Sequence, residues 1–427
     1  MKNFTIFFLS IVTFVSSNGC FFSSDSDHIN PTSLVYDENG VLTIKPPIWK
    51  FDLVKAREDL DFSINPLVFE DRVVVADLDN DGKEQLVGVD VKSGTEIWHW
   101  NELPDVGNFP IVSAFKIGDI LIYTSYRTVL AELYYHIFAI DPANGQILWS
   151  RLQHQFPVIR PSLDGVLLTY FEENSSLPMI IEISAKTGVE RYRVSPKMDR
   201  VISPLHFIDG SITNMITLLT ESKEKYLLYL YQDYNASEKY EEQWENNFIS
   251  LLNLSTGEHL YERDPLTIPN LAFANSIYFK PDNTLIFQSP YGDTAYNPFS
   301  QEVKWNTSHD YITYLSSVEG DFMVKVPSTY KDAATMLIDL KSGNTLWFMS
   351  GYKADNSIRI FNDVVYWVDS YDNKLFALDQ YSGELLRELQ DPSKFGRWQS
   401  FRPGVSEREN YLLAITDKQL VAYDISE

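Results

Sequence analysis

The chain has 427 residues, a formal net charge of −24 and one cysteine. This acidity disfavours binding to nucleic acid or to anionic lipid headgroups, and a single cysteine excludes any disulfide within the chain. Hydrophobic residues make up 44% of the composition and aromatic residues 14%, so burial alone can supply a sizeable core.

The chain begins with a segment typical of bacterial secretion signals. Lys2 is followed by an apolar run, Phe4 to Val15, which is too short to cross a bilayer comfortably. We therefore predict that residues 1–19 form a lipoprotein signal peptide and stand outside the fold.

The residues around the only cysteine resemble a bacterial lipobox. Gly19-Cys20 fits that pattern, whereas Ser17 replaces the usual leucine and Asn18 is polar. We predict that Cys20 is lipidated and holds the protein at a membrane, and that residues 20–32, rich in Ser and Asp, form a flexible tether. The alternative is a plain secretory signal followed by a stray thiol.

An isolated strand is predicted at Ile48 to Leu53, where Trp49 is a large apolar anchor with no strands before it. Further along, Asp77, Asp79 and Asp81 alternate and are followed by Gly82. Carboxylates at alternate positions before a glycine are typical of a calcium loop. The alternative is a polar hairpin turn, and calcium is the only ligand ion that the sequence suggests.

The segment Asp141 to Trp149 predicts a strand end, a tight turn and a new strand. Asp141 can accept hydrogen bonds from the backbone N–H groups of the turn. Gly145 can adopt the positive φ that the turn needs, and burial of Trp149 would pin the new strand.

The same four-residue spacings recur along the chain. Two further full copies are Asp90-Gly94-Trp98 and Asp339-Gly343-Trp347. The softer copies are Ser184-Gly188-Tyr192, Asn253-Gly257-Tyr261, Asn297-Gln301-Trp305 and Asp379-Gly383, after which Leu386 and Arg387 replace the aromatic residue.

This recurrence is an internal repeat. The anchor positions are 98, 149, 192, 261, 305, 347 and 387, at intervals of 51, 43, 69, 44, 42 and 40 residues. That spacing matches one four-stranded blade of a β-propeller. Counting Trp49 as well, residues 33–427 are predicted to form a single all-β, eight-bladed propeller; seven blades stay possible because the copy around Asn297 diverges.

The longest interval contains an insertion, residues 232–247, that is rich in acidic side chains. Tyr234, Tyr240 and Trp244 are interleaved with them. Exposed aromatic side chains on a protruding loop are common interface anchors. The insertion is therefore either a docking element for a partner protein or a solvated loop or short helix.

Three arginines lie in or beside the segments predicted to line the central channel: Arg160, Arg200 and Arg402. Converging arginines could grip a carboxylate or phosphate through paired hydrogen bonds. The alternative is local pairing with nearby acids such as Asp164.

The end of the chain predicts how the ring closes. Tyr411 to Thr416 and Leu420 to Ile425 form a strand pair that lacks a following anchor strand. The isolated strand around Trp49 would complete that blade and remove the free sheet edges.

The segment Leu375 to Leu385 resembles the repeat of pyrroloquinoline-quinone-type (PQQ-like) propellers, whose pattern is ALDxxTGxxxW. This family includes quinoprotein dehydrogenases and the non-enzymatic propeller lipoprotein of the outer-membrane barrel-assembly machinery. The resemblance implies that the dehydrogenases hold their cofactor with a ring of two adjacent cysteines and a calcium ion. This chain has one cysteine, so it lacks that pair.

No catalytic motif is apparent. The seven histidines are scattered without metal-type spacing, and no nucleophile elbow or phosphate loop is present. We therefore expect no enzyme and no cofactor, but a lipid-anchored scaffold that binds envelope proteins at the bacterial outer membrane. Alternatives are a surface-exposed binder of a small ligand or glycan and a degenerate quinoprotein dehydrogenase.

Overall fold

The computed structural model describes most of residues 44–424. The segments outside the description within that range are 46, 54–65, 79–83, 101–110, 130–131, 155–157, 172–177, 195–211, 221, 233–246, 266–275, 281, 290–291, 309–312, 328–333, 351–353, 370–373, 390–397, 406–409 and 417–418. Among the described residues, no helix is long and apolar enough to span a bilayer.

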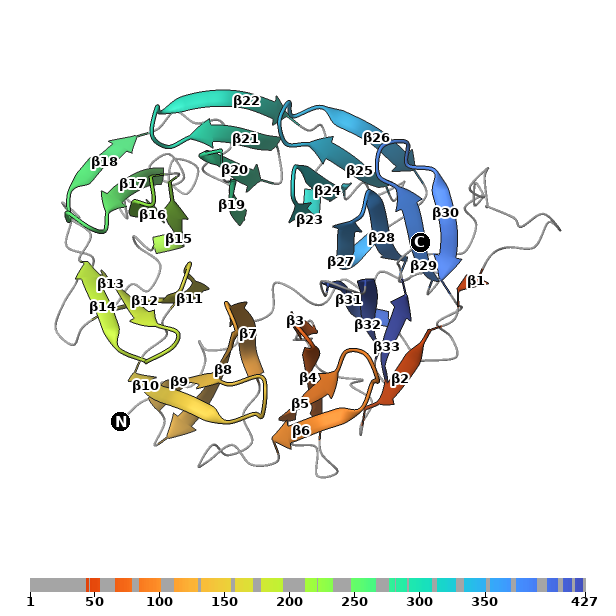
Figure 1. Cartoon of the computed structure of the whole chain (residues 1–427). Coiled ribbons are helices and arrows are strands. Elements are labelled where there is room, and N and C mark those ends of the chain that lie inside the picture. Colours follow the sequence, from red (N-terminus) through yellow and green to blue (C-terminus); the bar gives the residue numbers. More distant parts are fainter. Residues whose placement is uncertain are drawn as a thin grey trace, which may run out of the picture.

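The described chain forms eight antiparallel blades arranged around a central opening (Figure 1). The first four blades are β3 (Leu67–Phe69), β4 (Arg72–Leu78), β5 (Glu84–Asp90) and β6 (Glu96–Trp100); β7 (Ile111–Ile117), β8 (Ile120–Val129), β9 (Glu132–Ile140) and β10 (Ile147–His154); β11 (Val158–Pro161), β12 (Gly165–Phe171), β13 (Pro178–Ser184) and β14 (Glu190–Val194); and β15 (Ile212–Leu219), β16 (Lys225–Gln232), β17 (Asn247–Asn253) and β18 (His259–Pro265).

The remaining blades follow the same order from the innermost strand outward. They are β19 (Ser276–Lys280), β20 (Thr284–Ser289), β21 (Gly292–Asn297) and β22 (Glu302–Ser308); β23 (Thr313–Glu319), β24 (Phe322–Pro327), β25 (Ala334–Asp339) and β26 (Thr345–Ser350); β27 (Ala354–Phe361), β28 (Val364–Asp369), β29 (Lys374–Asp379) and β30 (Leu385–Leu389); and β31 (Trp398–Val405), β32 (Asn410–Thr416), β33 (Gln419–Asp424) and β2 (Trp49–Asp52). The prediction of an eight-bladed propeller is confirmed.

The cores lie between the blades rather than within a single layer. One apolar cluster joins Val75 and Val89 of the first blade to Leu413 and Leu420 of the eighth, and comparable clusters join successive blades from the first to the seventh. The middle strands of the first six blades are therefore covered on both faces. This explains why strands such as β12 are almost continuously apolar instead of alternating.

The start of the chain closes the ring, as predicted. β2 pairs antiparallel with β33, with Trp49 opposite Ala422. One strand was not predicted: β1 (Ile44–Lys45) pairs parallel with β30, the outermost strand of the seventh blade. The same short segment is thus hydrogen-bonded to the seventh and to the eighth blade.

Candidate functional site

The predicted turns are confirmed, and in each of them the N–H at the glycine position donates to the carbonyl four residues earlier. In the second blade, the Ala143 N–H donates to Asp141 Oδ1 at 2.8 Å and the Gly145 N–H donates to the Asp141 carbonyl at 2.9 Å. Gly145 has a φ of 74°, where a side chain would be strained. The turn fixes the direction of the backbone carbonyls between these two residues.

The anchor tryptophans make their main polar contacts with the neighbouring blades, which the sequence did not reveal. Trp98 of β6 donates its indole N–H to the Pro142 carbonyl of the second blade at 2.8 Å. Its ring also covers Gly145, where an added Cβ would lie 2.8 Å from Trp98 Cε3. A repeat's indole therefore pins the next repeat's turn, in addition to its own strand.

Five seams between blades share this arrangement. The indole N–H groups donate to the carbonyl three residues before the covered glycine: Trp49 to Val91 (2.7 Å), Trp98 to Pro142 (2.8 Å), Trp149 to Ala185 (2.6 Å), Trp305 to Leu340 (2.9 Å) and Trp347 to Gln380 (2.8 Å). Because these bonds join separate sheets, they hold the ring together as one body.

The seam between the third and fourth blades differs. Tyr192 occupies the position of the indole in the repeat and packs against the apolar cluster between the two blades, which includes Leu227 and Leu252. Burial raises the pKa of its phenol, and Glu182 raises it further. Among the described residues, nothing lies within 4 Å of a Cβ built on Gly257. The glycine of the fourth blade is therefore left uncovered.

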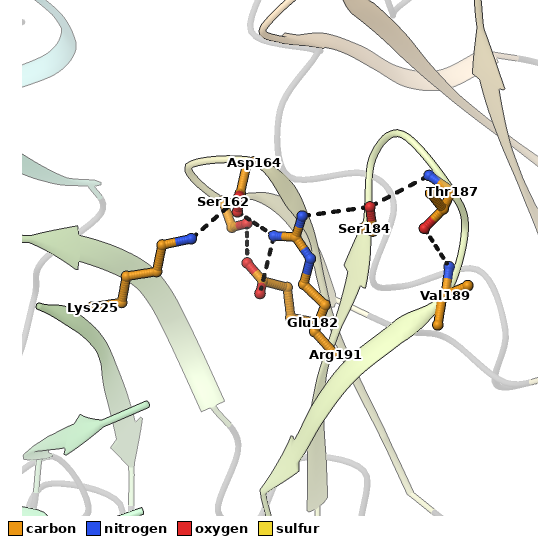
Figure 2. Close-up of polar contacts among 8 residues, drawn as sticks. All are labelled: Ser162, Asp164, Glu182, Ser184, Thr187, Val189, Arg191 and Lys225. Atoms are coloured by element: carbon orange, nitrogen blue, oxygen red, sulfur yellow. Dashed lines mark hydrogen bonds and ion pairs between the residues drawn. The ribbon is translucent and has the colours of Figure 1, made fainter. Parts of the chain in front are cut away.

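An ionic cluster joins the third and fourth blades on the face of the ring where the turn at Gly257 lies (Figure 2). Asp164 of the third blade binds Arg191 on its own blade, and Lys225 Nζ of the fourth blade lies 3.1 Å from Asp164 Oδ2. Burial raises the pKa of Asp164, but hydrogen bonds from Arg191 and Lys225 outweigh it and the net shift is downward. Asp164 is therefore a partner of these two cations.

The seam between the fifth and sixth blades holds a buried ion pair that no sequence pattern indicated. Lys325 of β24 contacts Asp293 of β21, with side chains 1% and 0% exposed. Burial lowers the pKa of Lys325, while Asp293 opposes that shift. At the edge of the seam, Lys280 and Lys341 lie 2.6 Å and 2.7 Å from Asp321.

The seam between the seventh and eighth blades has no tryptophan at the anchor position, where the sequence has Leu386 and Arg387. It is the seam that β1 and β2 span, since β1 adds to β30 and β2 adds to β33. Covalent continuity of the chain thus joins these two blades.

The calcium prediction stays a prediction. Asp77 lies on β4, 1% exposed, opposite Gln85 on β5, whereas Asp79 and Asp81 lie outside the described residues. No group of three potential metal ligands occurs in the described part of the chain.

Two of the three predicted channel arginines are on innermost strands. Arg160 is on β11 and Arg402 on β31, on opposite sides of the central opening (Figure 1); the side chain of Arg402 and all of Arg200 lie outside the description. Arg160 donates to the Ile159 carbonyl at 3.1 Å, and burial lowers its pKa. No described carboxylate pairs with it, and Asp164 binds Arg191 and Lys225 instead.

The remaining predicted sites also lie outside the described residues: Cys20, and Tyr234, Tyr240 and Trp244. Residues 233–246 connect β16 to β17, and residues 79–83 connect β4 to β5. Both connections link the second strand of a blade to its third. Because the blades repeat one strand order around the ring, the strand ends that flank the two segments lie on the same face.

The fold is that of an eight-bladed β-propeller, and its repeated turn resembles that of the PQQ-like propellers. A sequence model of the family described as outer membrane protein assembly factor BamB matches residues 34–166. A comparison with curated proteins finds no significant sequence match.

Solved structures of other propellers resemble this chain at low sequence identity. BamB from Moraxella catarrhalis gives a TM-score of 0.52 at 12% identity and covers 90% of this chain and 99% of its own. A europium-containing methanol dehydrogenase gives 0.56 at 11%, covering 87% and 84%. Saccharomyces cerevisiae Sqt1 gives 0.57 at 10%, covering 90% and 100%. At such identities these similarities establish the fold, which is shared by enzymes and non-enzymes.

Proposed function

We propose that this protein is a lipid-anchored, non-catalytic propeller that serves as a binding scaffold for other proteins in the bacterial cell envelope, at the outer membrane. The observation that carries the proposal is the match of residues 34–166 to the BamB family, combined with a closed ring of eight blades. BamB is described as an assembly factor of the outer membrane, and we infer an assembly role of the same kind.

The physical basis of a scaffold is a rigid body with accessible loops. Five indole bonds tie successive blades, so binding at the loops costs little conformational entropy in the ring itself. The connections on one face, which include residues 233–246, are the longer ones. We propose that Tyr234, Tyr240 and Trp244 contact a partner there.

Similarity to a methanol dehydrogenase raises the alternative of an enzyme. The sequence argues against a quinoprotein of that type, because the family's ring of adjacent cysteines needs two cysteines and this chain has one. Arg160, the described arginine of the channel, has a guanidinium that no described carboxylate neutralises. It could bind an anionic group of a partner, and Asp77 could contribute to a calcium loop.

The first experiment tests the anchor. Cys20→Ala, expressed in a Gram-negative host, is fractionated beside the unaltered protein. We expect the unaltered protein in the membrane fraction and the variant in the soluble envelope fraction. Retention of the variant on the membrane would contradict anchoring through Cys20. Comparing the two proteins by circular dichroism controls for folding.

The second experiment tests the scaffold. Mild crosslinking of the intact protein, followed by pull-down, should recover a defined envelope protein in stable proportion. Replacing Tyr234, Tyr240 and Trp244 together by alanine should reduce that recovery at least tenfold, since aromatic anchors dominate interfaces. A triple replacement of exposed rim residues Ile97, Leu148 and Leu346 is the matched control, because all three are apolar and exposed. Equal loss in both variants would contradict docking through residues 233–246.

A further inference from the structure

The turn of the fourth blade has the features of an indole-binding site but lacks the indole. In the five complete seams, a tryptophan ring lies on the glycine of the turn and donates to the carbonyl three residues earlier. The corresponding groups in the fourth blade are Gly257 and the carbonyl of Leu254.

The backbone of this turn is already in the form that receives an indole. Gly257 has a φ of 73°, beside 74° for Gly145 and Gly343. The Ser255 N–H donates to Asn253 Oδ1 at 2.9 Å, and the Gly257 N–H donates to the Asn253 carbonyl at 2.9 Å. The acceptor is therefore oriented without any ligand.

The turn of the fourth blade is hydrogen-bonded to its own blade in the same way as a turn that an indole covers. The Leu254 N–H donates to the Lys225 carbonyl at 2.9 Å, as the Leu340 N–H does to the Asp321 carbonyl at 2.8 Å in the sixth blade. Among the described residues no group donates to the Leu254 carbonyl, whereas the Leu340 carbonyl accepts from Trp305.

The side chain that could fill the position does not do so. Tyr192 packs against the apolar cluster between the two blades, and no described atom comes within 4 Å of a Cβ built on Gly257. The salt bridge between Lys225 and Asp164 joins the two blades instead (Figure 2). The seam is thus closed while the surface of Gly257 stays open.

We propose that this turn binds the side chain of a tryptophan presented by a partner protein, with the indole ring on Gly257 and its N–H donating to the Leu254 carbonyl. The inference rests on the proposed scaffold function and names one of its contacts. The chemistry is that of the five indoles that this molecule already binds in the same geometry.

The acidic residues near this turn indicate which residues should flank the partner's tryptophan. Glu258 follows Gly257 directly, Glu224 lies beside Lys225, and both are exposed, in a chain whose net charge is −24. Asp164 is already matched by Arg191 and Lys225. Complementary charge therefore favours a tryptophan flanked by lysine or arginine.

The test uses defined probes on the full chain. Binding of N-acetyl-tryptophanamide, of the same compound methylated at the indole nitrogen, and of the peptides acetyl-Lys-Trp-Lys-amide and acetyl-Glu-Trp-Glu-amide is measured by ligand-observed NMR. We expect the Lys-Trp-Lys peptide to bind more tightly than the Glu-Trp-Glu peptide. Methylation should weaken binding about three- to tenfold, which corresponds to the net ~0.5–1.5 kcal/mol of one hydrogen bond.

Variants place the binding at this turn. Tyr192→Trp supplies an internal indole and should weaken probe binding at least tenfold, whereas Tyr192→Phe leaves the position open and should bind as the unaltered protein does. Gly257→Asn is a second block, because asparagine tolerates positive φ and its side chain would cover the acceptor. Gly257→Asn provides the test of the site if Tyr192→Trp disturbs the fold.

Several results would overturn the proposal: no saturable probe binding to the unaltered protein, binding that survives both blocking variants, or a dimer in light scattering that Tyr192→Trp dissociates, since the occupant would then be a second copy. A negative result with these probes does not change the outcome of the Cys20→Ala fractionation or of the pull-down of an envelope protein. Failure of this site and failure of the scaffold function can therefore be told apart.

Discussion

Trp98→Ala should be among the most destabilising single substitutions in this protein. Trp98 is 9% exposed, and a buried tryptophan removes ~150–250 Å² from water. At ~25 cal/mol per Å² this is ~4–6 kcal/mol, and the hydrogen bond to the Pro142 carbonyl adds ~1 kcal/mol. Gly88 and Gly145 border the ring and have no side chains that could fill the cavity, so we expect a loss at the upper end of the usual ~3–5 kcal/mol.

Thermal and urea unfolding followed by circular dichroism measure this loss. For ~400 residues unfolding together, the entropy of unfolding is ~0.8 kcal/mol per degree, so Tm should fall by ~5–6 °C. Ile97→Ala is the matched control, because Ile97 is the preceding residue of β6 and is 45% exposed; its Tm should change by less than one degree. If Trp98→Ala lowered stability no more than Ile97→Ala, the indole would not be what joins the first two blades.

Gly145→Ala should cost more than Gly257→Ala by ~1–3 kcal/mol in unfolding free energy, because the φ values are 74° and 73° and only the first Cβ would meet an indole; equal costs would mean that backbone strain alone matters. Lys325→Met should lose ~3–5 kcal/mol by leaving Asp293 buried without its cation, and replacing both residues by apolar ones should recover much of it in the same urea assay. The pKa of Asp321 is lowered by Lys280 and then by Lys341, so its contribution is complete above the unfolded pKa of ~3.9 and disappears as pH falls through the folded value. The unaltered protein should therefore lose stability more steeply than Asp321→Asn as pH falls below about 4, by no more than ~1 kcal/mol for so exposed a group; parallel pH profiles would refute this.

The architecture could be predicted because the repeated turn is encoded locally. Asp141 and Gly145 bond within their own turn, so their spacing alone predicts the bonds that the structure contains. The divergent copy shows why chemistry matters more than identity: Gln301 takes the place of glycine and still adopts a φ of 60°. The strain is tolerated, and the blade that the sequence left in doubt is formed.

The contacts between blades could not be predicted from a local pattern. Trp98 and its acceptor Pro142 are separated by 44 residues, and nothing in either segment indicates the other until the ring is known. Lys325 follows apolar residues in β24, and a lysine in a strand is normally expected to face solvent. Its partner Asp293 lies on a different sheet, and only the packing of blades brings the two together.

The candidate sites show the same difference between features that are encoded locally and contacts that depend on the packing of the blades. Arg160 was correctly placed beside the channel because the innermost strand follows from the repeat. Asp164, one of the acids considered as its partner, lies at a turn and pairs with Arg191 and Lys225. Tyr192 reads as a conservative copy of the indole anchor, yet a phenol cannot donate from the same point as an indole N–H, and the side chain packs elsewhere.

The last blade takes its outer strand from the beginning of the polypeptide, and the side chains of Asp52 and Gln419 that meet there are 367 positions apart. While the ribosome is still making the chain, β2 therefore has nothing to pair with, and the ring can be completed only after the final strand has emerged. A nascent or C-terminally shortened chain would keep two open flanks, one on each side of the gap, and would be a natural target for proteases and for chaperones that hold extended chains.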